Sequence, residues 1–257
     1  MIASLMMYAR PELEAAHKRY WTLIRTELDK RGIASPAALS NDTPEFEVWR
    51  APDLVLSQTC GMPYRLFLKD DVALIGTPDF GVPGCPPGHY NSAIIVRADD
   101  TRSNLAAFQD ARFIYNQDIS QSGFAAIYAH VKPLGFWFAN RSPSGGHRLS
   151  AQAVAEGRAD IAAIDAVTWR LIERYDAFAQ DLRVLEWTEP TPGLPYIAAE
   201  GVDTRAYFDA IKVAIAGLSD QDRDALGLRD LIAIPKEAYL NIPNPPSSGL
   251  AEHHPSV

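Results

Sequence analysis

The chain of 257 residues has only two cysteines, no long apolar run and no cluster of basic residues. Its apolar stretches fall well short of the roughly 20 residues that a membrane-spanning helix needs, so we expect no membrane insertion. The net charge is −8, and without a basic patch we expect no nucleic-acid partner. With 47% hydrophobic and 22% charged residues, the composition is that of an ordinary globular protein.

The two cysteines, Cys60 and Cys85, both lie among glycines and prolines. An even number of cysteines in such loops fits one disulfide, and a disulfide indicates an oxidising compartment. We therefore expect a Cys60–Cys85 bridge, and the alternative is two unrelated thiols in a cytosolic protein. Neither cysteine has the basic surroundings of a nucleophile, since the nearest histidine to Cys85 is His89 and Cys60 has none nearby.

Several motifs that mark enzyme classes are also missing. The chain has no Walker lysine, no G-x-G-x-x-G loop and no G-x-S-x-G elbow. His147 and Asp165 have no obvious third ligand, so we expect no metal site. The sequence therefore predicts a protein that is not an enzyme and has no cofactor.

What the sequence does contain is a regular alternation of short apolar strands with helices. The predicted strands are 1–8, 46–49, 53–57, 72–77, 89–97, 111–115, 135–140, 159–164, 182–189 and 196–200. The predicted helices are 13–31, 62–69, 105–110, 124–134, 148–156, 167–176, 205–218 and 220–225. Such alternation is typical of α/β proteins, in which parallel strands are joined by helical crossovers.

The length and order of these elements predict two lobes, each a mainly parallel sheet flanked by helices. Lobe 1 is discontinuous and comprises 1–92 plus 197–245, while lobe 2 is the continuous middle, 93–196. Residues 246–257 form a flexible tail rich in Pro, Ser and Gly. Ligands of open α/β sheets bind beyond the carboxyl ends of the strands, so we expect the ligand in a cleft between the lobes.

The stretch Asn116–Gly123 joins a predicted strand to a predicted helix and carries two serines and a glycine. A helix start leaves backbone N–H groups without partners and carries partial positive charge. Serine hydroxyls add donors, and Gly123 allows a ligand to approach the backbone. The stretch is therefore a candidate oxyanion-binding turn without a lysine. Its plain alternative is a serine that only caps its own helix.

Other polar side chains follow the remaining strands and would meet at the same cleft. The candidate ligand-binding residues are Tyr8, Ser57, Gln58, Thr59, Tyr90, Ser120, Gln121, Ser122, Gly123, His147 and Asp165. Each has a plain alternative: Asp165 can be a helix N-cap, His147 a cap or surface histidine, and the two tyrosines core aromatics. Because the set is rich in hydroxyls and amides, a small anion explains it with fewer assumptions than a Ser/His/Asp hydrolase.

These residues resemble the PhnD-like family, the phosphate, phosphite and phosphonate substrate-binding proteins of ABC transporters within the type II periplasmic binding proteins. The resemblance rests on Asp118-Ile-Ser-Gln-Ser-Gly-Phe124, Ser144-Gly-Gly-His147, the segment 151–161 that follows it, and Thr191-Pro-Gly-Leu-Pro195. It covers most of residues 1–200. The resemblance implies a two-lobed, hinge-closing protein that binds a small oxyanion and catalyses no reaction.

The resemblance also implies roles for individual residues. In that family a Ser-x-Ser turn and a histidine hold the oxyanion, which here gives Ser120, Gln121, Ser122 and His147. A tyrosine at the lobe crossing corresponds to Tyr90. An acidic residue that can bind an amino group on the ligand corresponds to Asp165.

Two positions depart from the family pattern. Leu194 stands where aminophosphonate binders carry a second acidic residue, which disfavours an aminoalkylphosphonate. Gln121 stands where phosphonate binders usually have a hydroxyl. The first-lobe turn at Ser57 also indicates a distinct subgroup.

The expected partners follow from the family. They are a small anionic solute and the membrane permease of an ABC transporter, and we expect a monomer. We expect a periplasmic location, with a cytoplasmic one as the alternative because residues 1–10 lack the pattern of a secretory signal. The alternative function is an enzyme or sensor on the same fold, such as one like the pyrimidine-forming enzymes of thiamin biosynthesis, or a binder of a different small metabolite.

Overall fold

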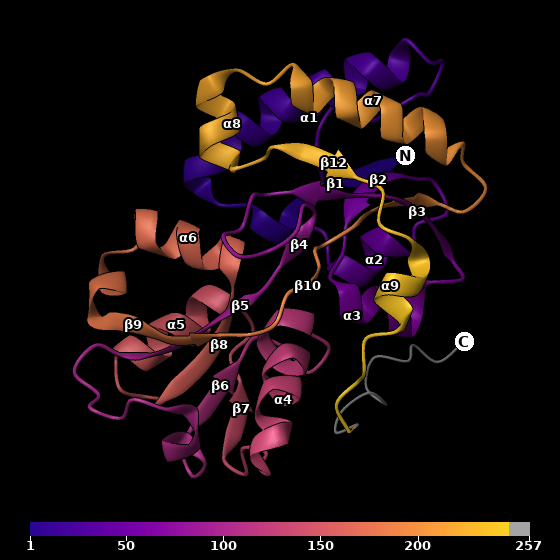
Figure 1. Cartoon of the computed structure of the whole chain (residues 1–257). Coiled ribbons are helices and arrows are strands. Elements are labelled where there is room, and N and C mark those ends of the chain that lie inside the picture. The colour runs from indigo at the N-terminus through magenta and orange to yellow at the C-terminus, as the bar shows by residue number, and fades with distance from the viewer. Residues whose placement is uncertain (247–257) are drawn as a thin grey trace. The chain divides into compact units, whose positions relative to one another are not determined.

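The computed structural model describes residues 1–246 and shows a chain divided into two compact units (Figure 1). Unit 1 contains Met1–His89 and Pro192–Asn241, and unit 2 contains Tyr90–Thr191 with the segment that starts at Ile242. The sequence-based division places the two crossings at 92/93 and 196/197. Apart from Pro246, the predicted flexible tail lies outside the described residues.

Unit 1 is built on a five-stranded sheet of order β1-β2-β11-β3-β12. Its elements are β1 (Ile2–Ser4), η1 (Met6–Tyr8), η2 (Pro11–Leu13), α1 (Glu14–Asp29), α2 (Glu45–Trp49), β2 (Leu54–Gln58), α3 (Gly61–Pro63), η3 (Tyr64–Leu68), β3 (Val72–Asp79), β11 (Tyr196–Ala199), α7 (Thr204–Ala216), α8 (Asp220–Leu226), β12 (Asp230–Ile232) and α9 (Lys236–Leu240).

Helices cover both faces of the unit 1 sheet (Figure 1). On one face, the apolar stripe of α1, with Ile24 and Leu28, packs with Ile211 of α7 over the strands. On the other face, Trp49 of α2 and Tyr239 of α9 pack over the sheet. The apolar residues of α1 and of α7 recur at the helical period, which is why these two helices were predictable.

Unit 2 is built on a second five-stranded sheet, of order β7-β6-β8-β5-β9. Its elements are β5 (Ser92–Arg97), η4 (Leu105–Phe108), β6 (Phe113–Tyr115), η5 (Gln121–Ala125), α4 (Ala126–Val131), η6 (Lys132–Leu134), β7 (Arg141–Pro143), α5 (His147–Ala155), β8 (Ile161–Asp165), α6 (Ala166–Tyr175), η7 (Ala177–Asp181) and β9 (Leu182–Trp187). A two-stranded pair, β4 (His89–Tyr90) with β10 (Thr191–Pro192), stands where the chain passes between the units.

The strands of unit 2 are buried on both faces. Along β5, Ile94 and Val96 face one hydrophobic cluster, whereas Ala93 and Ile95 face the other. This alternation is the period-two pattern of a strand between two helical layers. Helix α4 contributes Ile127 to the first cluster, and α5 and α6 cover the second.

The α/β fold class is confirmed, but the sheets are mixed rather than mainly parallel. In unit 1, β1 and β2 pair in parallel, whereas β11 runs antiparallel to both β2 and β3. In unit 2, β6 pairs in parallel with β7 and β8, and β5 is antiparallel to β8 and β9. Strands β5 and β11 enter their sheets directly from the connecting segments, so no helical crossover dictates their direction.

Several sequence-based element predictions are wrong. Residues 46–49 lie in a helix, α2, which begins after Pro44 and carries two glutamates in its first turn. Residues 135–140 form no strand; Phe138 instead stacks on Phe113 with ring centroids 4.7 Å apart, and the strand follows at β7. The predicted strand 89–97 is two strands, separated at Asn91. The short β12 and α9 were not predicted.

The predicted Cys60–Cys85 disulfide is also wrong, because the structure does not join the two cysteines. Cys60 is buried directly before α3, while Cys85 lies in a half-exposed turn. A disulfide requires the two Cα atoms within about 7 Å. An even count in glycine-rich loops carries no information about that distance.

We expect two reactive thiols per chain when the protein is denatured without reductant, because neither cysteine is in a disulfide. A thiol titration in guanidinium, with a reduced sample as the control, measures this number. A result of zero before reduction and two after it would contradict the structure.

None of the helices formed by residues 1–246 has the length and apolar character that a membrane span requires.

The packing of α7 on the unit 1 sheet gives a stability prediction. Ile211 is fully buried, so Ile211→Ala removes apolar contacts and leaves a cavity; we expect a loss of about 2–4 kcal/mol in the free energy of unfolding. Val213 lies on the same helix and is 48% exposed. Val213→Ala is therefore the matched control, with an expected change below about 0.5 kcal/mol. Urea denaturation measures both, and equal losses would contradict the packing.

Candidate ligand-binding site

Three turns of unit 2 meet at one edge of its sheet. Strands β6, β7 and β8 are parallel neighbours, so their carboxyl ends lie together. The turn after β6 leads to Ser120, the turn after β7 leads to His147, and Asp165 ends β8. The first two turns are tied by backbone hydrogen bonds, from the Ser144 N–H to the Tyr115 carbonyl (2.7 Å) and from Gly145 to Asn116 (2.9 Å).

Ser120 is the N-cap of the helical segment that starts with η5. Its Oγ accepts a hydrogen bond from the Gly123 N–H at 3.0 Å. The plain alternative from the sequence, a capping serine, is therefore observed. Because Oγ acts as the acceptor in this bond, its own hydroxyl proton stays available as a donor.

Gly123 is required by the close packing of the turn. A Cβ at this position would lie 2.0 Å from Asn116 Oδ1 and 3.1 Å from His147 Cε1. A larger residue would have to displace the Asn116 side chain of the same turn and would press on His147 of the next turn. Gln121, between the two serines, is 1% exposed.

Ser122 and His147 form the central contact of the site. Ser122 Oγ lies 2.8 Å from His147 Nε2, and the Ser122 carbonyl accepts the hydroxyl proton of Ser92 at 2.9 Å. Burial lowers the pKa of His147 to about 4, and the backbone of Ala163 offsets part of this effect. The imidazole is therefore neutral at pH 7.

His147 Nδ1 is buried and makes no hydrogen bond within normal limits to residues 1–246. The neutral ring carries one N–H, and its tautomer decides whether Nε2 or the Ser122 hydroxyl donates in their contact. With the proton on Nε2, the ring can donate to Ser122 or to a bound anion.

Asp165 acts as a helix cap. Its Oδ1 accepts the N–H groups of Val167 (2.8 Å) and Thr168 (3.0 Å) at the start of α6. The side chain is 2% exposed, and the helix start stabilises its charge. Asp165 lies in register with Ser92 of β5, which places it at the same sheet edge as the serine turn.

The predicted unit 1 residues lie at the carboxyl ends of β1 and β2. Ser57, Gln58 and Thr59 are all buried. Gln58 Nε2 donates to the Leu194 carbonyl at 3.1 Å, and the Thr59 N–H donates to the Pro195 carbonyl at 3.0 Å. These two bonds hold the 194–195 loop against β2, while Ser57 Oγ makes only a long contact of 3.5 Å to the next carbonyl.

The two predicted tyrosines are buried aromatics. Tyr8 ends η1 and packs edge-on against Phe80, with ring centroids 5.0 Å apart. Tyr90 ends β4 and is 3% exposed.

The sequence did not single out the polar residues that support the serine turn. Ser92 bonds to the Ser122 carbonyl, and its own N–H donates to Thr188 Oγ1 at 2.9 Å. Asn116 lies against Gly123. Asn116 was inside the predicted turn, but Ser92 and Thr188 are brought there only by the pairing of β5 with β8 and β9. Within residues 1–246, no group of three or more His, Cys, Asp or Glu side chains is placed to hold a metal ion.

A family model described as the periplasmic substrate-binding protein of phosphonate ABC transporters matches residues 56–235. The chain belongs to this family. The match includes the serine turn, His147 and the 191–195 loop. No curated protein sequence is similar to the chain.

Several solved structures share the fold of this chain. PhnD1 of Prochlorococcus marinus, in complex with methylphosphonate, is 16% identical, with a TM-score of 0.68 and 94% of each chain covered. A binding-protein component of a phosphonate ABC transporter from Pseudomonas aeruginosa is 17% identical, with a TM-score of 0.63, 94% of this chain and 83% of that one covered. The Xanthomonas citri protein XAC2383, bound to ATP, is 13% identical, with a TM-score of 0.65 and 92% and 91% covered.

The neutral state of His147 gives a pH prediction. Its pKa is about 4 in the folded protein and about 6.5 in the unfolded chain, so the unfolded state binds the extra proton between these values. The free energy of unfolding falls as the pH drops from 6.5 to 4, by at most about 3 kcal/mol from this group. His17 contributes a further decrease in the free energy of unfolding over the same pH range, because burial also lowers its pKa to about 4.

Urea denaturation at pH 7, 5.5 and 4.5 measures this fall for the wild type and for His147→Gln. In His147→Gln, the decrease in the free energy of unfolding that is due to His147 should be absent. The decrease that is due to His17 should remain. A pH dependence that is identical in the two proteins would contradict a neutral, buried His147.

Proposed function

We propose that this chain captures a small oxyanion, such as phosphate, phosphite or a simple phosphonate, for an ABC uptake system. The observation that carries the proposal is the meeting of Ser122 and His147 at 2.8 Å, beside the start of a helical segment. The turn offers a donor-rich backbone, two hydroxyls and a helix start. Family membership supports a solute-binding role, and the phosphonate-bound neighbour supports the ligand class.

Neutral groups rather than cations would hold the anion. The predicted residues of unit 2 include no lysine or arginine, and His147 is neutral. Backbone N–H groups and hydroxyls can nevertheless stabilise an anion when water is excluded, because hydrogen bonds to charged groups are about twice as strong as neutral ones. Asp165 is held by α6 and disfavours fully deprotonated, doubly charged ligands at the same edge.

The serine and histidine are better placed for binding than for hydrolysis. A nucleophilic serine needs a base that is oriented by a third group, commonly a carboxylate. The Nδ1 of His147 makes no hydrogen bond within normal limits to residues 1–246, and the Asp165 carboxylate caps α6. This arrangement supports a binding protein.

The family also suggests where the protein works. We propose a periplasmic location and a membrane permease as the partner that receives the ligand. The hinge closure and the monomeric state expected from the sequence remain predictions. Leu194, in place of a second acidic residue, favours a ligand without an amino group.

Calorimetry with methylphosphonate, phosphite and phosphate tests the site. We expect that Ser122→Ala and His147→Ala each lower the affinity for the tightest-binding of these ligands by about ten- to a hundredfold. Each variant removes a hydrogen bond to a charged group. Ser120→Ala should weaken binding and also cost about 1 kcal/mol of stability through the lost cap.

The matched control is Ser142→Ala, which changes an exposed serine on β7 of the same unit. Its affinity should equal that of the wild type. If all three site variants bind like the wild type, the assignment of the site is wrong. Release of a product by the wild type but not by Ser122→Ala would favour a hydrolase instead.

A further inference from the structure

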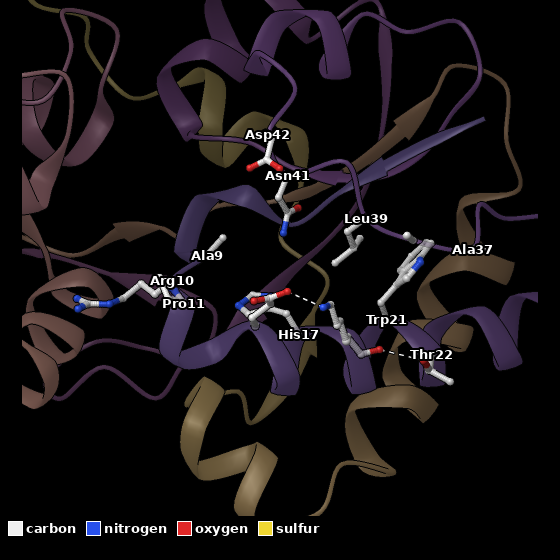
Figure 2. Close-up of a pocket in the computed structure, with 13 residues that line it drawn as sticks. Ala9, Arg10, Pro11, His17, Trp21, Thr22, Ala37, Leu39, Asn41 and Asp42 are labelled. Atoms are coloured by element: carbon white, nitrogen blue, oxygen red, sulfur yellow. Dashed lines mark hydrogen bonds and ion pairs between the residues drawn. The ribbon is translucent and has the colours of Figure 1, made fainter.

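A pocket of about 610 Å³ lies in unit 1 between α1 and the segment that follows it (Figure 2). His17 and Trp21 line it from one turn of α1 to the next, and Leu39, Asn41 and Asp42 line it from the other side. None of the eleven predicted ligand-binding residues is among its lining residues. The pocket therefore shares no lining residue with the predicted ligand-binding set.

His17 is the buried polar group of this pocket. Its side chain is 9% exposed, and neither ring nitrogen makes a hydrogen bond within normal limits. Burial lowers the pKa of His17 to about 4, and the backbone of Tyr8 offsets only part of that effect. The neutral ring has one donor and one acceptor nitrogen. A buried polar group without a normal partner costs free energy unless a ligand or water satisfies it.

Asn41 supplies a donor of fixed orientation. Its Oδ1 accepts hydrogen bonds from the Leu5 N–H at 2.9 Å and from the Ser4 hydroxyl at 3.1 Å. Since a backbone N–H must face the oxygen, Nδ2 is the remaining end of the amide, and no hydrogen bond from it is found among residues 1–246. In Figure 2 the Asn41 side chain extends toward the His17 side of the pocket.

The rest of the inner wall is flat and apolar. The Trp21 ring is 2% exposed and held in place by a hydrogen bond from Nε1 to the Pro36 carbonyl at 3.2 Å. Leu39 and the small residues Ala37 and Ala38 complete the wall. A planar ring that enters such a space buries its faces against aromatic and aliphatic carbon.

The charges around the pocket balance. Two basic and two acidic residues line it, and both basic ones are already paired: Lys18 with Glu14 at 2.5 Å, and Arg10 with Glu12 at 3.2 Å. With the cations neutralised, a free anion gains little here. The pocket therefore differs in chemistry from the serine turn of unit 2.

We propose that the pocket of His17, Trp21 and Asn41 is a second binding site, for an uncharged aromatic or heteroaromatic ring that carries a hydrogen-bond donor and acceptor. The ring lies against Trp21 and Leu39. The acceptor of the ring accepts a hydrogen bond from Nδ2 of Asn41. The polar edge of the ring forms the missing hydrogen bond to a ring nitrogen of His17. The site is independent of the oxyanion proposed for unit 2.

Nicotinamide is a suitable probe, because it combines a neutral ring with a carboxamide that donates and accepts. We expect nicotinamide to shift the indole N–H resonance of Trp21 saturably in the full chain labelled with ¹⁵N, the peak being identified by its loss in Trp21→Phe. Benzoate has a similar shape but is an anion, and it should bind at least about tenfold more weakly because the site lacks an unpaired cation.

Two variants test the assignment. His17→Phe keeps a ring but removes both nitrogens, so nicotinamide should bind about three- to tenfold more weakly. Ala38→Trp fills the pocket from its exposed side without altering α1 and should abolish the shift. Val213→Trp, which adds the same side chain to an exposed position on α7, should leave it unchanged.

The proposal is wrong if nicotinamide gives no saturable shift, or if Ala38→Trp leaves the titration unaltered. It is also wrong if a folded His17→Phe binds like the wild type. Methylphosphonate binding, measured in the same samples, should be unaffected by Ala38→Trp. The two measurements therefore distinguish a failure of the proposed ring site from a failure of the proposed oxyanion site.

Discussion

The parallel pairing of β6 with both β7 and β8 is the constraint on which the candidate site depends. Parallel neighbours end at the same edge, so the turns that follow them must meet. Backbone hydrogen bonds from Ser144 and Gly145 then join the second turn to the first. The contact between Ser122 and His147 results from this register and not from their separation in sequence.

Both proposed sites contain a neutral, buried histidine, but the two rings differ in their surroundings. At His147 one ring nitrogen, Nε2, meets the Ser122 hydroxyl at 2.8 Å, so the ring holds that hydroxyl in place. At His17 neither nitrogen has a normal partner, and the ring faces a pocket with apolar walls. Dipoles and helix starts suit an anion in the first site, and balanced charges suit an uncharged ring in the second.

Much of the fold was predictable because its periodic signals are strong. Helix α1 and helix α7 carry apolar residues at helical spacing, and β2 and β3 are short buried runs. The errors have physical causes. The short helix α2 is too brief to show a period, and the aromatic residues around Phe138 pack in a cluster without forming a strand. Strands β5 and β11 were predicted as strands, but their antiparallel direction was not, because direction depends on how a strand enters its sheet.

The sequence by itself determined the α/β class, the serine turn and the family, since these depend on local patterns and on residues adjacent in the chain. Only the tertiary structure decided what each polar group does. It showed that Ser120 and Asp165 cap helices, that Ser122 bonds to His147, and that the cysteines are not joined. Hydrogen bonds and disulfides depend on distances of a few ångströms between segments far apart in the chain, and composition and spacing do not contain those distances.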